Sequence, residues 1–407
     1  MSRGQESGAM GEQGAAGTAV PALAQRAGRT PFYVYDTDVV KAQLAALRAV
    51  LPPEVRLHYA LKANPFPPLV EYLAHHTDGF AVASGGELAL ALEADLPRGF
   101  DIGFAGPGKS LEEIRAGVAA DVLFHCESVR ELRAIAVAGE VAALRPRVAL
   151  RINPDITLRG AGQRMGGGPR PFGIDAEAAP AVLALLATLP VDFAGFHFYA
   201  GSQMLDAATV VTLLEHCYDC ALALAVHAPA PVRVLNLGGG FGVPYHAGEQ
   251  PLALAPIGAA MHRLVARAAQ DFPDAKLVLE LGRYLVAPAG RYVTRVVDRK
   301  ESRGEVFLIC DGGMHHHLAA SGNLGQVLRR NFPVELVSAA AEASLLATET
   351  VTVCGPLCTP LDVLAQRVEL PVAAEGDFIV IGMSGAYGAT ASPRGFLSHR
   401  GPVELLV

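Results

Sequence analysis

From Arg56 onward the chain alternates short apolar runs with longer amphipathic ones. Eight of the apolar runs predict β-strands, namely 56–63, 79–84, 101–106, 122–126, 147–153, 192–201, 232–240 and 276–282. Apolar positions at helical spacing lie between them, as in 69–76, 86–94, 128–138, 176–189 and 257–272. Strands that are apolar on both faces and alternate with helices are typical of parallel sheets. Eight such units predict a (β/α)8 barrel over 37–285.

The pattern changes after residue 282, where strand-like segments follow one another without long amphipathic stretches. These segments are 292–301, 304–313, 350–356, 377–385 and 402–407, with a short helical possibility near 324–331. Such segments, separated by turn residues, predict an all-β domain. A strand at 31–36 precedes the barrel, so we assign 29–36 together with 286–407 to a C-terminal β-sandwich or β-barrel. The predicted fold class is α/β, a TIM-type barrel followed by this β domain.

Composition and charge narrow the class of protein. Of the 407 residues 51% are hydrophobic and 18% charged, which suffices for a globular core. The net charge of −7 argues against nucleic-acid and membrane partners, whose binding faces need excess cations. Residues 1–28 are rich in Gly, Ala and Gln without an apolar core, which predicts a disordered tail and no signal peptide. Since no run of about 18 uncharged apolar residues is found, a soluble, cytoplasmic protein is expected.

Cysteine and histidine spacing gives no metal site. The six cysteines do not form a disulfide framework, and Cys217 and Cys220 lie in a segment of helical pattern without a second pair nearby. We interpret them as buried thiols. His315, His316 and His317 are consecutive, which is poor geometry for one ion, so we assign them to an interface or a substrate-side segment and predict no metal.

Lysines are scarce, which limits where amine chemistry can occur. The chain has five, at positions 41, 62, 109, 276 and 300. Lys62, in HYALKANP, is the one predicted to end a barrel strand, where barrel enzymes gather their chemistry. A desolvated lysine amine has a lowered pKa and can form a Schiff base. A lysine that only extends to the barrel rim is the alternative.

Two further strand ends suit a phosphorylated cofactor. Gly238, Gly239 and Gly240 follow the seventh strand, where backbone N–H groups can cradle a phosphate. Glu280 ends the eighth strand, and a carboxylate there can pair with a protonated pyridine nitrogen. A lysine and a phosphate cradle on one rim indicate pyridoxal 5′-phosphate. Taken singly, the glycines could form tight turns, and Glu280 could form a salt bridge with Arg283.

The sixth strand ends in GFHFYAGSQ, which supplies two more candidates. The imidazole of His197 could lie beside a cofactor ring, or the residue could be a packed core histidine. Ser202 could donate a hydrogen bond to the phosphate.

The chain resembles the fold-type III pyridoxal-phosphate-dependent decarboxylases. The resemblance is carried by Lys62 and, in this order, by the motifs GFHFYAGSQ, LGGGFG, ELGR, GPLC and SGAYG. That family includes diaminopimelate, ornithine and arginine decarboxylases, with alanine racemase as a distant relative, and the resemblance covers about residues 30–407. FAGPGKS, MGGGPRPFGID and DGGMHHHLAASGNLGQV are most similar to the decarboxylases associated with exosortase and exopolysaccharide systems. The glutamyl-carrier-protein decarboxylases of aminoglycoside side-chain biosynthesis are another similar branch.

The resemblance implies a role for each matching residue. Lys62 would hold the cofactor covalently, His197 would stack on its ring, and Glu280 would pair with the pyridine nitrogen. The phosphate would be held at four places, namely Ser202, Gly238–Gly240, Arg283 and Tyr387. Cys358 would reach the site from the partner subunit and handle the proton that replaces carbon dioxide. A homodimer with shared active sites is therefore expected.

Three departures from the family pattern bear on the substrate. Ala81 stands where relatives usually carry Asp, which alters hydrogen bonding near the lysine. Thr359 follows Cys358 where diaminopimelate and ornithine enzymes place an acidic residue to bind a distal ammonium. DGGMHHHLAAS lacks the Arg-Pro that diaminopimelate enzymes present. These departures favour a substrate without a distal cation, or an aminoacyl group on a carrier protein.

The expected function is decarboxylation of the α-carboxylate of an amino acid. Two alternatives stay open. In a related racemase or epimerase, Lys62 and Tyr387 would act as paired bases. The presence of Glu280 and Cys358 argues against this alternative. A non-catalytic pyridoxal-phosphate-binding protein is the other alternative, although such proteins usually lack a β domain.

Overall fold

The computed structural model describes residues 20–156, 163–164, 166–324, 326, 329–339 and 347–407. The chain divides into two compact units. The barrel unit comprises Thr37–Pro244 and Gly248–Ala287, and the β unit comprises the residues up to Asp36, Tyr245–Ala247 and Pro288–Val407.

Eight parallel strands close the barrel. They are β2 (Arg56–Ala60), β3 (Gly79–Val82), β4 (Asp101–Phe104), β5 (Leu123–Cys126), β6 (Arg147–Asn153), β9 (Asp192–Phe198), β11 (Val234–Gly239) and β12 (Lys276–Leu281). Their order is β5-β4-β3-β2-β12-β11-β9-β6, and pairing of β5 with β6 closes the ring. The short β8 (Ile174–Asp175) adds to β6, and β7 (Gln163–Arg164) pairs with β10 (Gly201–Ser202). All eight predicted barrel strands are therefore present, which confirms the fold class.

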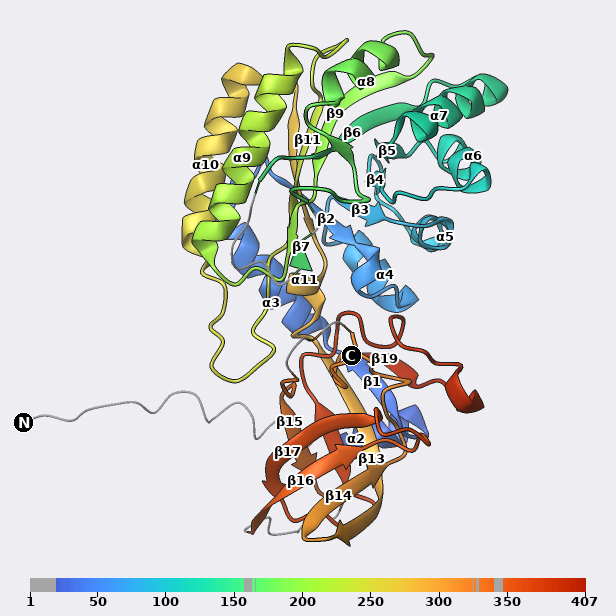
Figure 1. Cartoon of the computed structure of the whole chain (residues 1–407), viewed down its shortest axis with the longest axis vertical. Coiled ribbons are helices and arrows are strands. Elements are labelled where there is room, and N and C mark those ends of the chain that lie inside the picture. The colour runs from blue at the N-terminus through green and yellow to red at the C-terminus, as the bar shows by residue number, and fades with distance from the viewer. Residues whose placement is uncertain (1–19, 157–162, 165, 325, 327–328, 340–346) are drawn as a thin grey trace, which may run out of the picture. The chain divides into compact units, whose positions relative to one another are not determined.

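Helices surround the strands of the barrel unit (Figure 1). They are α3 (Thr37–Arg48), α4 (Pro67–Ala74), α5 (Gly85–Glu93), α6 (Leu111–Ala119), α7 (Val129–Ala142), α8 (Ala179–Leu186), α9 (Ala207–Ala225), α10 (Leu254–Asp271) and α11 (Arg283–Val286). Three of them begin after a serine whose hydroxyl accepts an N–H from the first turn, namely Ser84, Ser110 and Ser128. Such caps satisfy amide groups that would otherwise lack a partner, and they fix where each helix leaves the strand before it.

Helix α9 is long and apolar enough to cross a membrane by length and composition alone. In this structure it packs beside α10 (Figure 1), with Leu213, Leu214 and Cys217 buried. Core helices of globular proteins pass the same test. Cys217 and Cys220 are free thiols on α9, the first buried and the second partly exposed.

The β unit is built on one sheet of eight strands. They are β1 (Phe32–Tyr35), β13 (Gly290–Ser302), β14 (Glu305–Cys310), β15 (Val334–Val337), β16 (Thr348–Cys354), β17 (Val363–Pro371), β18 (Phe378–Ile381) and β19 (Val403–Leu406). The early strand β1 pairs with β13 and β19. The sequence prediction missed β15 and β17. Part of the possible helix near 324–331 lies outside the described residues.

One expectation for the N-terminus requires correction. Residues 1–19 lie outside the described part of the chain, but Val20–Ala27 forms helix α2. Val20 and Ala24 are buried in a cluster with Phe32, Val293 and Phe378 of the β unit. The apolar spacing of four between Val20 and Ala24 is the feature that a composition-based prediction of a tail over 1–28 overlooked.

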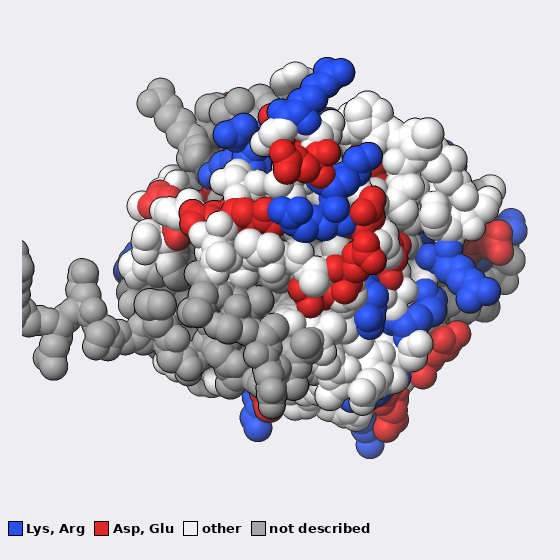
Figure 2. All heavy atoms as spheres, turned by 90° about the horizontal axis from the view of Figure 1, so that it is seen from below, with Lys and Arg blue, Asp and Glu red and all other residues white. Residues whose placement is uncertain are grey.

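Basic and acidic side chains are interspersed on the face of the molecule seen in Figure 2. Within the β unit, Arg299 of β13 donates two hydrogen bonds to Glu349 of β16, at 3.0 and 2.6 Å. A polyanion-binding protein needs a continuous basic surface. This mixed face does not provide one.

Candidate active site

Four neighbouring barrel strands carry the predicted site residues at their carboxyl ends. In barrel order these strands are β2, β12, β11 and β9. Glu280 near the end of β12 pairs in register with His58 of β2 and with Gly239 of β11. His197 of β9 pairs with Asn236 of β11. Register alone thus brings three sequence-distant segments to one end of the barrel, as a barrel enzyme requires.

Glu280 is a buried carboxylate held in a fixed orientation. It is 5% exposed, and Asn236 Nδ2 donates to its Oε1 at 2.7 Å. The Nε2 atom of His197 lies 3.3 Å from the same oxygen. Burial alone would raise the pKa of Glu280, but the imidazoles of His197, His125 and His58 together hold it well below the usual value. Glu280 is therefore an anion throughout the neutral range, and it can accept a hydrogen bond from a cationic ring N–H.

Two histidines that the sequence analysis did not select complete this cluster. His125 of β5 stacks on His197, with ring centroids 3.9 Å apart and planes at 14°. Its Nδ1 lies 3.7 Å from Glu280 Oε1. Burial lowers the pKa of both His125 and His58 from the usual value. Their positions on apolar strands made them look like core residues, and only barrel closure shows that they surround one carboxylate.

The glycine run Gly238–Gly240 at the end of β11 packs closely against neighbouring backbone. Gly238 and Gly240 have φ of +73° and +80°, which residues with a side chain rarely adopt. A Cβ on Gly239 would overlap the carbonyl oxygen of Glu280, and one on Gly240 would overlap that of Gly201. A side chain at either position would therefore displace backbone.

The segment that follows Ser202 is joined to the glycine run by backbone hydrogen bonds of Met204. Met204 N–H donates to Gly240 O at 3.0 Å, and Gly242 N–H donates to Met204 O at 2.9 Å. Ser202 itself lies in β10 and is 8% exposed. The predicted hydroxyl and glycine amides therefore belong to one loop system. Arg283 follows the end of β12 as the first residue of α11.

Lys62 and Lys109 differ in what surrounds their amines. Strand β2 ends at Ala60, earlier than predicted, so Lys62 lies in a short 3₁₀ turn, Leu61–Ala63, just beyond the strand. Its Nζ lies 4.8 Å from the ring centre of Tyr199. Lys109 Nζ, in contrast, is buried and donates to Gly106 O, His125 O and Glu131 Oε1 at 2.9, 3.2 and 2.7 Å. The amine of Lys109 therefore has a structural role.

The barrel residues fit pyridoxal phosphate. The ring nitrogens of His58 and His197 and Nδ1 of His125 are buried without a hydrogen-bond partner among the described residues. Such orphaned polar atoms around an anionic carboxylate suit a cationic heteroaromatic ring. His125, His197 and Glu280 also present ligand atoms within 4.8 Å of one another, a spacing that a metal ion could use.

Other predicted residues belong to different surroundings. Cys358 and Tyr387 lie in the β unit, Cys358 exposed and Tyr387 at φ +54°. Ala81 of β3 is 8% exposed between Ala60 and Gly103, so an apolar methyl group lines this part of the barrel. His317 is buried in the β unit, where its Nε2 lies 2.8 Å from Ser384 Oγ. It is a structural histidine there.

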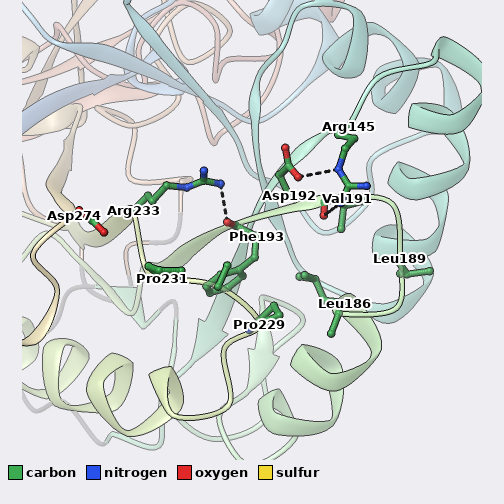
Figure 3. A pocket seen from close by; sticks show the side chains of 12 residues that line it. Arg145, Leu186, Leu189, Val191, Asp192, Phe193, Pro229, Pro231, Arg233 and Asp274 are labelled. Atoms are coloured by element: carbon green, nitrogen blue, oxygen red, sulfur yellow. Dashed lines mark hydrogen bonds and ion pairs between the residues drawn. The ribbon is translucent and has the colours of Figure 1, made fainter.

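A cavity of about 450 Å³ opens at the amino-terminal ends of β9 and β11 (Figure 3). Arg145 Nε donates to Asp192 at 3.0 Å, and Arg233 donates to Phe193 O at 2.9 Å. These cations are already paired, and this end of a barrel usually serves stability. We therefore place the active site at the opposite end.

Comparison with known proteins supports this interpretation. Residues 37–287 match the model of the pyridoxal-dependent decarboxylase family, pyridoxal binding domain. The chain is 39% identical over 382 residues to an L-glutamyl-[BtrI acyl-carrier protein] decarboxylase of Niallia circulans, covering 93% of this chain and 88% of the relative. It is 32% identical over 377 residues to a 2-[(L-alanin-3-ylcarbamoyl)methyl]-2-hydroxybutanedioate decarboxylase of Staphylococcus aureus, covering 91% and 92%.

A solved structure shows the same fold over nearly the whole chain. Diaminopimelate decarboxylase from Helicobacter pylori, complexed with L-lysine, superposes with a TM-score of 0.81 at 26% identity. The similarity covers 95% of this chain and 93% of that one. Barrel and β domain are thus both shared with this enzyme.

Proposed function

The chain belongs to the pyridoxal-dependent decarboxylase family, and from that premise we propose that it decarboxylates an L-glutamyl group attached to an acyl-carrier protein. Its cofactor is pyridoxal phosphate. When bound, this cofactor supplies an electron sink for the electron pair left on the α-carbon as carbon dioxide departs. The remaining steps depend on the residues of the chain.

Each residue in the barrel has a distinct task in this proposal. Lys62 would provide the amine that holds the cofactor. Glu280, ionised and oriented by Asn236, would keep a proton on the ring nitrogen, which favours electron withdrawal. His197, supported by the stacked His125, would contact the ring. The amides of Gly238–Gly240 and the hydroxyl of Ser202 would hold the phosphate.

The proposed dimer would place Cys358 of the partner subunit at the α-carbon. There its thiol would deliver the proton that replaces carbon dioxide. Cys358 is exposed in the single chain, so a partner surface can cover it. The cytoplasm is the proposed compartment, because six free thiols, several of them buried, suit reducing conditions.

The segment after Cys358 carries the substrate assignment. Thr359 is neutral, and its Oγ1 accepts the N–H of Leu361 at 3.3 Å within a turn. The nearby carboxylate of Asp362 already accepts the N–H groups of Met314 and Leu357, at 2.6 and 2.8 Å. This segment therefore offers no uncommitted carboxylate for a distal ammonium. A substrate whose far end is an acyl group linked to a carrier protein has no distal ammonium and needs no such carboxylate. The Niallia circulans relative acts on a carrier-linked substrate of this kind.

Carbon dioxide release tests the proposal. We expect the holoenzyme to release carbon dioxide from glutamyl-carrier protein at least about a hundredfold faster, by kcat/KM, than from free glutamate, diaminopimelate or ornithine. Comparable or faster release from a free diamino acid would contradict the substrate assignment.

A further inference from the structure

The β unit contains a second cavity, lined by cationic and amide side chains. It measures about 590 Å³ and is lined by His246, Ala247, Arg329, Arg330, Asn331, Gln366 and Arg367. Among these described lining residues none is acidic. Three arginines, Arg329, Arg330 and Arg367, therefore line one concave space in a chain whose net charge is −7.

The frame of this cavity is fixed by hydrogen bonds between distant segments. Asn331 Nδ2 donates to Gln366 O at 2.8 Å, and Gln366 N–H donates back to Asn331 Oδ1 at 2.9 Å. His246 Nδ1 lies 3.0 Å from Asn331 O, which ties in a third segment. Three chain segments are thus locked around the cavity, and a preformed site loses little entropy when a ligand binds.

The arginines are held in place as well. Arg329 donates to the carbonyl oxygen of Val363, and partial burial lowers its pKa. Arg367 has φ of +49°, a left-handed conformation that is costly for a residue with a side chain. Its N–H points to Thr352 Oγ1 at 3.4 Å. Backbone strain of this kind persists where surrounding structure imposes it, and it frequently accompanies ligand sites.

We propose that this cavity binds the phosphate of the prosthetic arm by which an acyl-carrier protein presents its substrate. Guanidinium groups pair with phosphate oxygens through two parallel hydrogen bonds, which makes arginine the usual residue for this task. His246 follows the phosphate-cradling Gly240 after five residues of chain, so the cavity and the cofactor loop are directly connected in sequence. The inference rests on the proposed carrier-bound substrate, and a free phosphate would offer the same chemistry from another source.

Binding to the full-length holoenzyme tests the inference without relying on turnover. The probes are 4′-phosphopantetheine, pantetheine, which lacks the phosphate, and inorganic phosphate, each titrated by calorimetry. We expect 4′-phosphopantetheine to bind at least about tenfold more tightly than either other probe, and Arg330→Glu with Arg367→Glu to abolish that difference. Lys300→Glu with Arg303→Glu, the same total charge change at exposed positions on β13 and in the turn after it, is the matched control and should leave binding unchanged.

Kinetics provides the second readout. In the Arg330→Glu/Arg367→Glu protein we expect KM for the glutamyl-carrier substrate to rise at least about tenfold, with kcat nearly unchanged. Equal binding of pantetheine, equal binding of inorganic phosphate, or wild-type affinity in the double variant would each overturn the proposed site. Failure of the wild-type enzyme to release carbon dioxide from the carrier substrate would instead overturn the proposed function, so the two failures are distinguishable.

Discussion

At the scale of single residues, the ionised state of Glu280 controls the proposed chemistry. We predict that Glu280→Gln lowers kcat on the order of a hundredfold, because a neutral amide no longer keeps the ring nitrogen protonated. The absorption spectrum of the bound cofactor should change in parallel. Glu112→Gln, an exposed position on α6, should behave as wild type. A Glu280→Gln enzyme with wild-type kcat would contradict this role.

Asn236 tests whether orientation of Glu280 matters separately from its charge. Asn236→Ala removes the 2.7 Å hydrogen bond to Glu280 Oε1 but leaves the carboxylate in place. We predict a smaller loss in kcat, about tenfold, together with an altered pH profile of the cofactor spectrum. A loss as large as that of Glu280→Gln, without a spectral change, would indicate a folding defect instead.

Lys62 is the proposed point of covalent attachment. After borohydride reduction of the holoenzyme, peptide mass spectrometry should find the cofactor on Lys62. We expect Lys62→Ala to lose both this label and at least about a thousandfold of the activity, whereas Lys41→Ala, exposed on α3, should keep both. Label retained in Lys62→Ala would refute the assignment.

The sequence selected candidate site residues that lie at or just beyond the ends of recognisable strands. Lys62, Glu280 and the glycine run were identified by motif and placed on adjacent strands by barrel closure. His58 and His125 were not identified from the sequence. A histidine on a buried strand shows no functional pattern in the sequence, and only the closed barrel places these two beside Glu280. Asn236, two residues before Gly238, could have been found as a partner for a strand-end carboxylate.

At the scale of elements, the loop after β11 depends on the absence of side chains. Gly239→Ala would press a methyl group against the carbonyl oxygen of Glu280. We predict at least about tenfold weaker cofactor binding, measured by fluorescence titration of the apoenzyme, with unchanged circular dichroism. Gly108→Ala is the matched control, because its Cβ would meet nothing within 4 Å. Unchanged affinity in Gly239→Ala would show that the loop does not hold the phosphate.

The buried histidine of the β unit predicts a stability change with pH. Burial lowers the pKa of His317 to about 3, so the native state stays neutral while the unfolded chain takes up a proton below about 6.5. Stability is therefore lost as pH falls from about 6.5 toward 3, by up to about 1.4 kcal/mol per pH unit from this residue. Denaturant unfolding at several pH values gives the free energy of unfolding as a function of pH. This free energy should fall less steeply with decreasing pH in His317→Gln than in His227→Gln, a control at an exposed position.

Strands β15 and β17 were not predicted from the sequence because neither shows a clear alternation of apolar and polar residues. Strand β15 spans only Val334–Val337, directly after Pro333, too short for a clear alternation. Strand β17 carries exposed Gln366 and Arg367, and its pairing with β16 shifts register on either side of Val353. A bulge of this kind breaks the two-residue period by which a strand is recognised.

At the scale of the whole molecule, the proposed shared site predicts complementation between inactive subunits. Lys62→Ala and Cys358→Ala homodimers should each be nearly inactive. Mixed under conditions that exchange subunits, they should recover about a quarter of wild-type activity, because half of the dimers would contain one intact site of two. No recovery despite exchange, verified by native mass spectrometry, would contradict a site built from both subunits.

The central claim is that this chain removes a carboxylate rather than inverting a stereocentre. The most direct measurement is mass spectrometry of the product formed from glutamyl-carrier protein by the holoenzyme in deuterium oxide. We predict loss of the α-carboxylate as carbon dioxide, with one solvent deuterium on the former α-carbon. A product that gained deuterium at that carbon but kept its carboxylate would contradict it.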